Sequence, residues 1–283
     1  MLTEKLMLLF AFAVISPLAL RLGANPQPRY PQVYRAAMIF LPIAAICGGI
    51  SLALPEGIPA KILAIPWLLE TFLVALFGLT RFLSRRSHPL DELVLDAGLA
   101  YTALGGVWFI IWRFGLTPFD FGTNIIILTA VHFHYINLTA MLFAAMVGRS
   151  LTAHRKPYEA AAVGLIVAPQ FVATGITVSV VELELIGAII IAASLITVTF
   201  LTIRLILPTI ERPIAKWLLA IACAIIFLTM AFAVAYPLGR LSDWWGLTFS
   251  DMLRWHGVLN ALVFGFCGLL GWNLLAPPPR RQW

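Results

Sequence analysis

Charged residues are scarce in this sequence: only 11% of its 283 residues are Asp, Glu, Lys or Arg, against about 25% in soluble domains. Hydrophobic residues make up 61%, and the mean hydropathy is +0.95. A chain of this composition cannot build the polar surface of a water-soluble fold. The composition therefore excludes soluble enzymes and soluble binding modules.

Cysteines and soluble-enzyme motifs are also lacking. The three cysteines, Cys47, Cys223 and Cys267, stand singly inside apolar runs, which excludes a disulfide framework or a paired-cysteine metal site. No phosphate-binding loop, dinucleotide fingerprint or HExxH motif is present. The net charge is +6, but the basic residues lie between apolar runs, so topology explains them better than nucleic acid does. We expect no nucleic-acid partner.

Apolar runs fill the rest of the chain, and nine of them approach the length needed to cross a hydrocarbon layer of ~30 Å. Helices are expected, because a single span must satisfy its own backbone hydrogen bonds in lipid. The sequence therefore predicts an all-α, polytopic membrane bundle that forms one multi-pass transmembrane domain over residues 1–283. The expected spans are 5–22, 33–54, 59–81, 92–114, 123–148, 157–178, 181–207, 213–236 and 251–275.

The basic residues predict the orientation of these spans. Of the 19 lysines and arginines, fourteen fall in the connections after spans one, three, five and seven and in the C-terminal tail. The positive-inside rule then places the N-terminus outside and the C-terminus in the cytoplasm. The first span resembles a signal peptide, but the arginines that follow it favour a retained helix. The other five basic residues lie on the outer side: Lys5, Lys61, Arg113, Arg240 and Arg254.

Polar residues inside the spans are the candidate functional residues, since an ionisable side chain within a membrane is expensive and is a functional candidate by default. The expected depth of each places all of them between the midplane and the outer surface, which predicts one cavity open to the outside. The ionisable candidates are Glu70, His132, His134, Glu182, Glu184 and His256, and the uncharged ones are Asn137, Gln170 and Asn260.

The spacing of His132 and His134 restricts their roles. Positions two apart on a regular helix point about 200° away from each other, so one ring enters the cavity while the other packs elsewhere. We favour His134 as the cavity-facing ring. Its replacement is expected to abolish activity, whereas replacement of His132 is expected to lower the folded yield. Asn260, one turn after His256, is placed to orient that ring.

Four functions are compatible with these residues. The first is a metal-dependent membrane enzyme that acts on a lipid or another hydrophobic substrate, with zinc or iron held by His132, His134 and His256. In this hypothesis Glu70 or Glu184 is the catalytic base, and Asn137, Gln170 and Asn260 contact the substrate.

The remaining hypotheses use the same residues differently. The second is a transporter in which Glu70, His132 and His134 relay protons or substrate. The third is haem ligation by histidines on facing helices. The fourth is a structural role, in which the histidines bond neighbouring helices and membrane lipids are the partners.

Other polar and aromatic residues have plainer interpretations. We expect Glu92 and Asp96 to pair with Arg85 or Arg86 near the cytoplasmic face. The tryptophans near the outer interface are expected to anchor helices there. They are Trp67, Trp108, Trp112, Trp244, Trp245 and Trp255.

Two short motifs carry a family resemblance. One is His132-Phe133-His134-Tyr135, and the other runs from Trp255-His256-Gly257 to Asn260-Ala261. With these motifs the chain resembles the YndJ-like membrane proteins of bacteria over most of its length. The resemblance implies a multi-pass protein of the bacterial inner membrane, with His132, His134, His256 and Asn260 at signature positions. It implies no particular activity.

Overall fold

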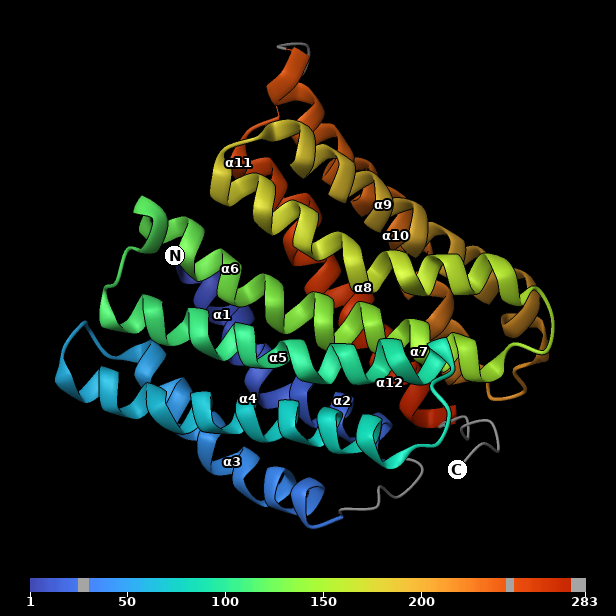
Figure 1. Cartoon of the computed structure of the whole chain (residues 1–283), viewed down its shortest axis with the longest axis horizontal. Helices are drawn as coiled ribbons and strands as arrows, with labels where there is room; N and C mark the ends of the chain where they lie inside the picture. Colours follow the sequence, from blue (N-terminus) through green and yellow to red (C-terminus); the bar gives the residue numbers. More distant parts are fainter. Residues whose placement is uncertain (25–30, 243–246, 276–283) are drawn as a thin grey trace. The chain divides into compact units, whose positions relative to one another are not determined.

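The computed structural model describes the chain except for residues 25–30, 243–246 and 276–283. All the regular structure in the described part is helical (Figure 1). Nine helices in that part are long and apolar enough to cross a membrane. The predicted all-α, multi-pass membrane fold is therefore confirmed, while the orientation of the termini stays a prediction.

The nine spans start and end within a few residues of the predicted limits. The first consists of α1 (Leu2–Phe10), η1 (Ala11–Ile15) and α2 (Ser16–Gly23), and the fifth of α6 (Thr123–Tyr135), η3 (Ile136–Met141) and α7 (Leu142–Ser150). The others in the first half are α3 (Pro31–Ala53), α4 (Ile58–Ser84) and α5 (Leu90–Phe114). A short turn, η2 (Pro118–Asp120), precedes the fifth span.

The second half holds the remaining four spans. They are α8 (Arg155–Val178); α9 (Val181–Leu201) with η4 (Thr202–Ile206) and η5 (Leu207–Thr209); α10 (Pro213–Ser242); and α11 (Phe249–Asp251) with η6 (Met252–Val258), η7 (Asn260–Gly265) and α12 (Phe266–Leu275).

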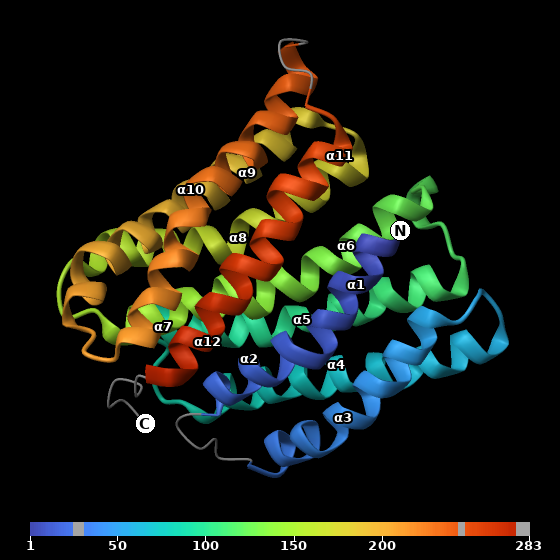
Figure 2. The same cartoon turned by 180° about the vertical axis from the view of Figure 1, so that it is seen from behind.

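The chain folds as two compact units that meet in sequence within the fifth span, between Leu142 and Phe143. In the first unit, α3, α4, α5 and α6 pack in chain order (Figure 1). The first span lies against α3 and α6 (Figure 2). In the second unit, α9 packs between α8 and α10, and the last span packs against α10.

Five segments have π-helical hydrogen bonding: η1, η3, η4, η6 and η7. They interrupt spans one, five, seven and nine, and two of them occur in the last span alone. π-Helical turns widen a helix locally and are frequent at functional sites. Three of the four polar residues at the predicted signature positions lie in such a segment or within two residues of one: His134, His256 and Asn260.

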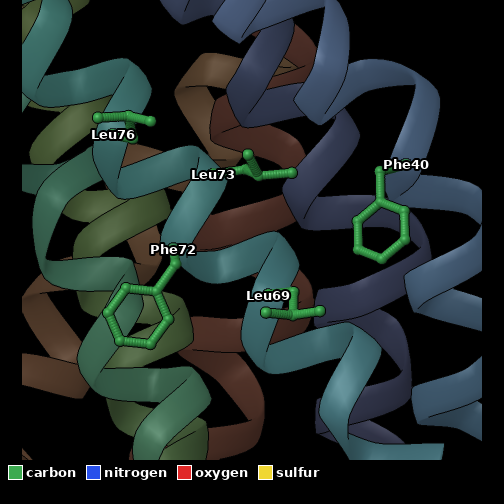
Figure 3. Close-up of a pocket in the computed structure, with 5 residues that line it drawn as sticks. All are labelled: Phe40, Leu69, Phe72, Leu73 and Leu76. Atoms are coloured by element: carbon green, nitrogen blue, oxygen red, sulfur yellow. The ribbon is translucent and has the colours of Figure 1, made fainter.

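An apolar groove runs along the outside of the first unit, between α3 and α4 (Figure 3). Its lining consists only of apolar side chains: Phe40, Leu69, Phe72, Leu73 and Leu76. The four residues on α4 fall on one side of that helix, and Glu70 points about 110° away from their mean direction. This groove is therefore the surface expected to face lipid, and it contains none of the candidate polar residues.

Candidate functional site

Glu70 is buried in α4 without a hydrogen-bonding partner. Its side chain is 1% exposed, and neither carboxyl oxygen has a hydrogen-bond partner among the described residues. Buried polar groups in proteins are nearly always hydrogen-bonded, so each exception needs an explanation. Within a membrane span this exception marks Glu70 as a functional candidate.

Trp67, one turn before Glu70, joins α4 to α6 by a hydrogen bond. Its indole N–H donates to Nε2 of His134 over 2.8 Å. An indole nitrogen only donates, so Nε2 of His134 must accept, and Nδ1 must carry the ring proton. That proton faces the carbonyl of Ala130, 2.7 Å away. His134 is therefore a neutral ring with both nitrogens engaged.

Phe12, in the π-helical part of the first span, covers this pair. Its ring stacks on Trp67 with 3.8 Å between ring centroids and lies 5.5 Å from the ring of His134. Two glycines leave room for the rings. A Cβ on Gly48 would lie 2.9 Å from the Phe12 ring, and one on Gly105 would lie 2.7 Å from Nδ1 of His134.

The two histidines of the fifth span have unequal surroundings. His134 is fully buried, whereas His132 is exposed. This difference agrees with the turn of about 200° between positions two apart. Asn137 follows in η3, where it is fully buried. Neither polar atom of its side chain has a hydrogen-bond partner among the described residues, so Asn137 is a second exception of the same kind as Glu70.

Ionic groups gather at the end of α4 that is predicted to be cytoplasmic. Arg81 donates from Nη2 to Glu92 over 2.6 Å and from Nε to Asp96 over 3.0 Å. Arg85 also pairs with Asp96, and its Nη1 lies 3.7 Å from Glu92. The expected pairing of both acids with Arg85 is confirmed.

Arg81 is the member of this cluster that sequence analysis missed. Its side chain is fully buried, and Nη1 donates to the carbonyl of Gly23 over 2.5 Å. Gly23 ends the first span, where helix carbonyls lack intrahelical partners and attract cations. The predicted span 59–81 ends at Arg81, and the count of basic residues assigns Arg81 to the connection that follows, whereas α4 continues to Ser84.

The second unit holds a separate polar cluster around Thr229 of α10. Nδ1 of His256 lies 2.9 Å from the Thr229 carbonyl, so that nitrogen carries the ring proton. The Thr229 hydroxyl donates to Oδ1 of Asn260 over 2.8 Å. The amide nitrogen of Asn260 lies 3.3 Å from the His256 ring, which confirms the expected contact between these two residues.

The other polar candidates of the second unit differ in burial. Glu184 is buried and accepts from Arg240 over 2.6 Å, so its carboxylate is neutralised by a partner. Glu182 and Gln170 are exposed. Glu184 therefore differs from Glu70, whose carboxyl oxygens have no hydrogen-bond partner among the described residues.

The tryptophan prediction is wrong for two residues. Trp67 is 1% and Trp112 is 3% exposed, so both are packed inside the first unit and do not anchor it in the interface. Lys5 and Arg113 lie over the Trp112 ring, 5.7 and 4.8 Å from its centroid. Trp255 is exposed as expected, while Trp244 and Trp245 lie outside the described residues.

The described residues contain no group of three His, Cys, Asp or Glu side chains placed to hold a metal ion. His134 belongs to the first unit and His256 to the second. That these two histidines share one cavity stays a prediction. The same holds for a metal site made of His132, His134 and His256.

Comparison with known proteins agrees with the motifs. The family model described as "YndJ-like protein" matches residues 6–264. The "Uncharacterized membrane protein YndJ" of Bacillus subtilis (strain 168) is 30% identical over 233 residues, which cover 82% of this chain and 41% of that relative. The chain thus spans about two fifths of the length of this curated relative. No solved structure matches the chain.

Proposed function

The chain belongs to the YndJ-like family of membrane proteins, and from that premise we propose that it is a proton-coupled transporter in which Glu70 binds the proton. The burial of the Glu70 carboxyl without a hydrogen-bond partner among the described residues carries this proposal. An ionised carboxylate is expensive to bury without a partner, whereas the neutral acid is much less so. The surroundings of Glu70 therefore suit its protonated form.

Loss of that proton links the chemistry to a change of conformation. A carboxylate at Glu70 needs water or a hydrogen-bond donor, and the part of the chain that the structure describes gives neither of its oxygens a donor. Deprotonation then favours any conformation in which α4 and its neighbours separate enough to admit water. A site whose two protonation states prefer two conformations is the element that a proton-coupled carrier needs.

His134 supports this proposal more than it supports a metal-dependent enzyme. A histidine ligand offers a nitrogen lone pair to the metal. In His134 that lone pair accepts the Trp67 N–H, and the other nitrogen faces the Ala130 carbonyl. The ring instead fixes Trp67 one turn from Glu70.

Asn137 is our candidate for contact with the transported molecule. Its buried amide offers one acceptor and two donors, and neither polar atom is used within the described residues. A neutral group that both donates and accepts hydrogen bonds, such as a hydroxyl or an amide, satisfies such a side chain without bringing charge into the membrane.

Labelling with dicyclohexylcarbodiimide tests the proton site directly. This apolar reagent enters membranes and adds to protonated carboxyl groups to give a stable acylurea. We expect mass spectrometry of the labelled full chain to find the adduct on Glu70, and its yield to fall as the pH is raised. Glu70→Gln should remove the adduct, while Glu182→Gln, at an exposed glutamate, should leave it unchanged. A Glu70 that takes no label, or takes the same label at every pH, contradicts the proposal.

Proteoliposomes test the coupling. With a pH-sensitive dye inside, addition of the transported solute should change the internal pH for the unmodified chain and leave it unchanged for Glu70→Gln. A panel of hydroxyl- and amide-bearing solutes is the first set to apply. A solute that enters equally well through both proteins without proton movement refutes the role of Glu70.

A further inference from the structure

Glu70 and Arg81 lie on the same face of α4. They are eleven residues apart, which returns a helix to within about 20° of the same direction and separates them by about 16 Å along its axis. Val74 and Phe77 lie between them on that face, and the side chains of all four residues are buried. The stripe therefore has one ionisable group at each end and apolar side chains between them.

The first span contacts α4 near both ends of this stripe. At the predicted outer end, Phe12 stacks on Trp67. At the other end, a Cβ on Gly23 would lie 3.2 Å from the ring of Phe77, and the Gly23 carbonyl accepts from Arg81. We call the first span from Phe12 to Gly23, together with the stretch of α4 from Trp67 to Arg81 whose two ends it contacts, the seam. Along α4, Glu70 lies between Trp67 and Phe77, two of the residues at which these contacts occur.

The two ends of the seam are closed by different chemistry. Phe12 and Trp67 close one end by aromatic stacking, and the Trp67 N–H is already engaged by His134. Arg81 closes the other end through one charge-assisted hydrogen bond to a backbone carbonyl, and this bond can be exchanged for water near the membrane surface. The second closure is the one that opens more easily.

The carboxylates of α5 hold Arg81 in position for this contact. Glu92 and Asp96 occupy Nη2 and Nε and leave Nη1 directed at Gly23. They follow α4 after a short connection, so their ion pairs stay within one helical hairpin. The bond from Arg81 to Gly23, in contrast, joins this hairpin to the first span. Buried ion pairs add little net stability compared with apolar packing, so stability alone does not account for this arrangement.

We propose that the contact between Arg81 and the Gly23 carbonyl is a latch that closes the seam between Glu70 and the predicted cytoplasmic side. Release of the latch lets the end of the first span move away from α4 and admits water past Phe77 and Val74 to Glu70. The latch rests on the proposed function, because it gives the proton site its access to one side.

A cysteine reporter in the seam tests the latch without using Glu70. The reporter is Val74→Cys in a full chain whose Cys47, Cys223 and Cys267 are replaced by serine. A membrane-impermeant thiol reagent is applied from the C-terminal side of reconstituted vesicles. We expect slow modification with Arg81 present and a rate about tenfold higher with Arg81→Gln, as expected for loss of one charge-assisted hydrogen bond.

Arg85→Gln is the matched control. Arg85 pairs with the same two carboxylates, while the bond to Gly23 comes from Arg81. Modification of Val74→Cys should therefore stay slow in Arg85→Gln. Arg81→Lys keeps the positive charge opposite Glu92 and Asp96, so it should fold even if Arg81→Gln does not. Because an ammonium group cannot reach three acceptors in the geometry of a guanidinium, the rate of thiol modification in this variant should be intermediate.

The outcomes separate the latch from the proton site. Equal rates in Arg85→Gln and the Arg81 variants, or a slow rate in folded Arg81→Lys, overturn the latch. A higher rate of thiol modification in the Arg81 variants alone supports the latch, even if carbodiimide labelling shows that Glu70 binds no proton. In that case the proposed function fails and the latch stands.

Discussion

Trp67 and His134 are 67 residues apart in the sequence, and a single hydrogen bond of 2.8 Å joins their side chains inside the first unit. The bond fixes the tautomer of His134, because an indole can only donate. It also fixes the indole above Glu70, where Phe12 stacks on it. The histidine motif therefore contributes to the site by holding another side chain in place.

Trp67→Phe tests this bond. The change keeps an aromatic ring for Phe12 but leaves Nε2 of His134 buried without a donor, and we expect unfolding to become easier by about 1–3 kcal/mol. Trp112→Phe is the control. Trp112 is also buried, but its N–H has no hydrogen-bond partner among the described residues, so its replacement should have a much smaller effect. Thermal unfolding of the detergent-purified variants measures both, and equal losses contradict a special role for the Trp67 bond.

His134→Ala and His132→Ala should differ in folded yield. The first removes a buried ring that bonds both Trp67 and Ala130, and we expect a loss of about 2–4 kcal/mol from the cavity and the orphaned donor. The second removes an exposed side chain and should change stability by less than about 1 kcal/mol. This order reverses the expectation drawn from helix geometry alone. Fluorescence-detected size-exclusion chromatography compares the yields, and a lower yield for His132→Ala would contradict it.

The sequence predicts the spans well because hydrocarbon imposes a length and a composition on each of them. It also predicts Glu70 and His134 as unusual residues, because an ionisable side chain stands out within an apolar run. The sequence does not show which side chains these residues contact. The position of Trp67 near the outer part of its span is typical of an interface anchor, and nothing local shows that its N–H faces a histidine on another helix.

The contacts of Arg81 are likewise not predictable from the sequence. An arginine at the end of an apolar run has the composition of a loop, and the positive-inside rule counts it as one. Only the fold brings Gly23, Glu92 and Asp96 around it. The π-helical segments are equally invisible in the sequence, since the residues of η3 have no helix-breaking composition.

Glu70→Met should stabilise the protein while abolishing its proton binding. Methionine fills a similar volume, and it removes the penalty of a buried carboxyl that has no hydrogen-bond partner among the described residues. We expect a gain of about 1–3 kcal/mol. A gain in stability coupled to a loss of function is typical of functional residues. Glu92→Met is the contrasting variant, because it leaves Arg81 short of a carboxylate in a buried cluster and should destabilise by about 3–5 kcal/mol. If Glu70→Met instead destabilises as strongly as Glu92→Met, Glu70 has a structural partner and the proposed site is wrong.

The latch and the proton site both depend on the orientation of the chain, which the basic residues predict. Fourteen of the 19 lysines and arginines lie on the side of Arg81 and Arg85, so this side is expected to be cytoplasmic. A reporter enzyme fused after Arg281 should then be active only in the cytoplasm, and one inserted after Thr117, between α5 and the fifth span, only outside. Thr117 is suited to insertion because it lies in a short connection next to exposed residues.

The opposite result, with the first fusion active outside and the second active in the cytoplasm, would show that the chain has the reverse orientation. The latch would then separate Glu70 from the external medium. Five of the described spans lie between Thr117 and Arg281, so the two fusions should report opposite compartments. Activity of both in the same compartment would mean that an even number of spans separates them, in conflict with these five.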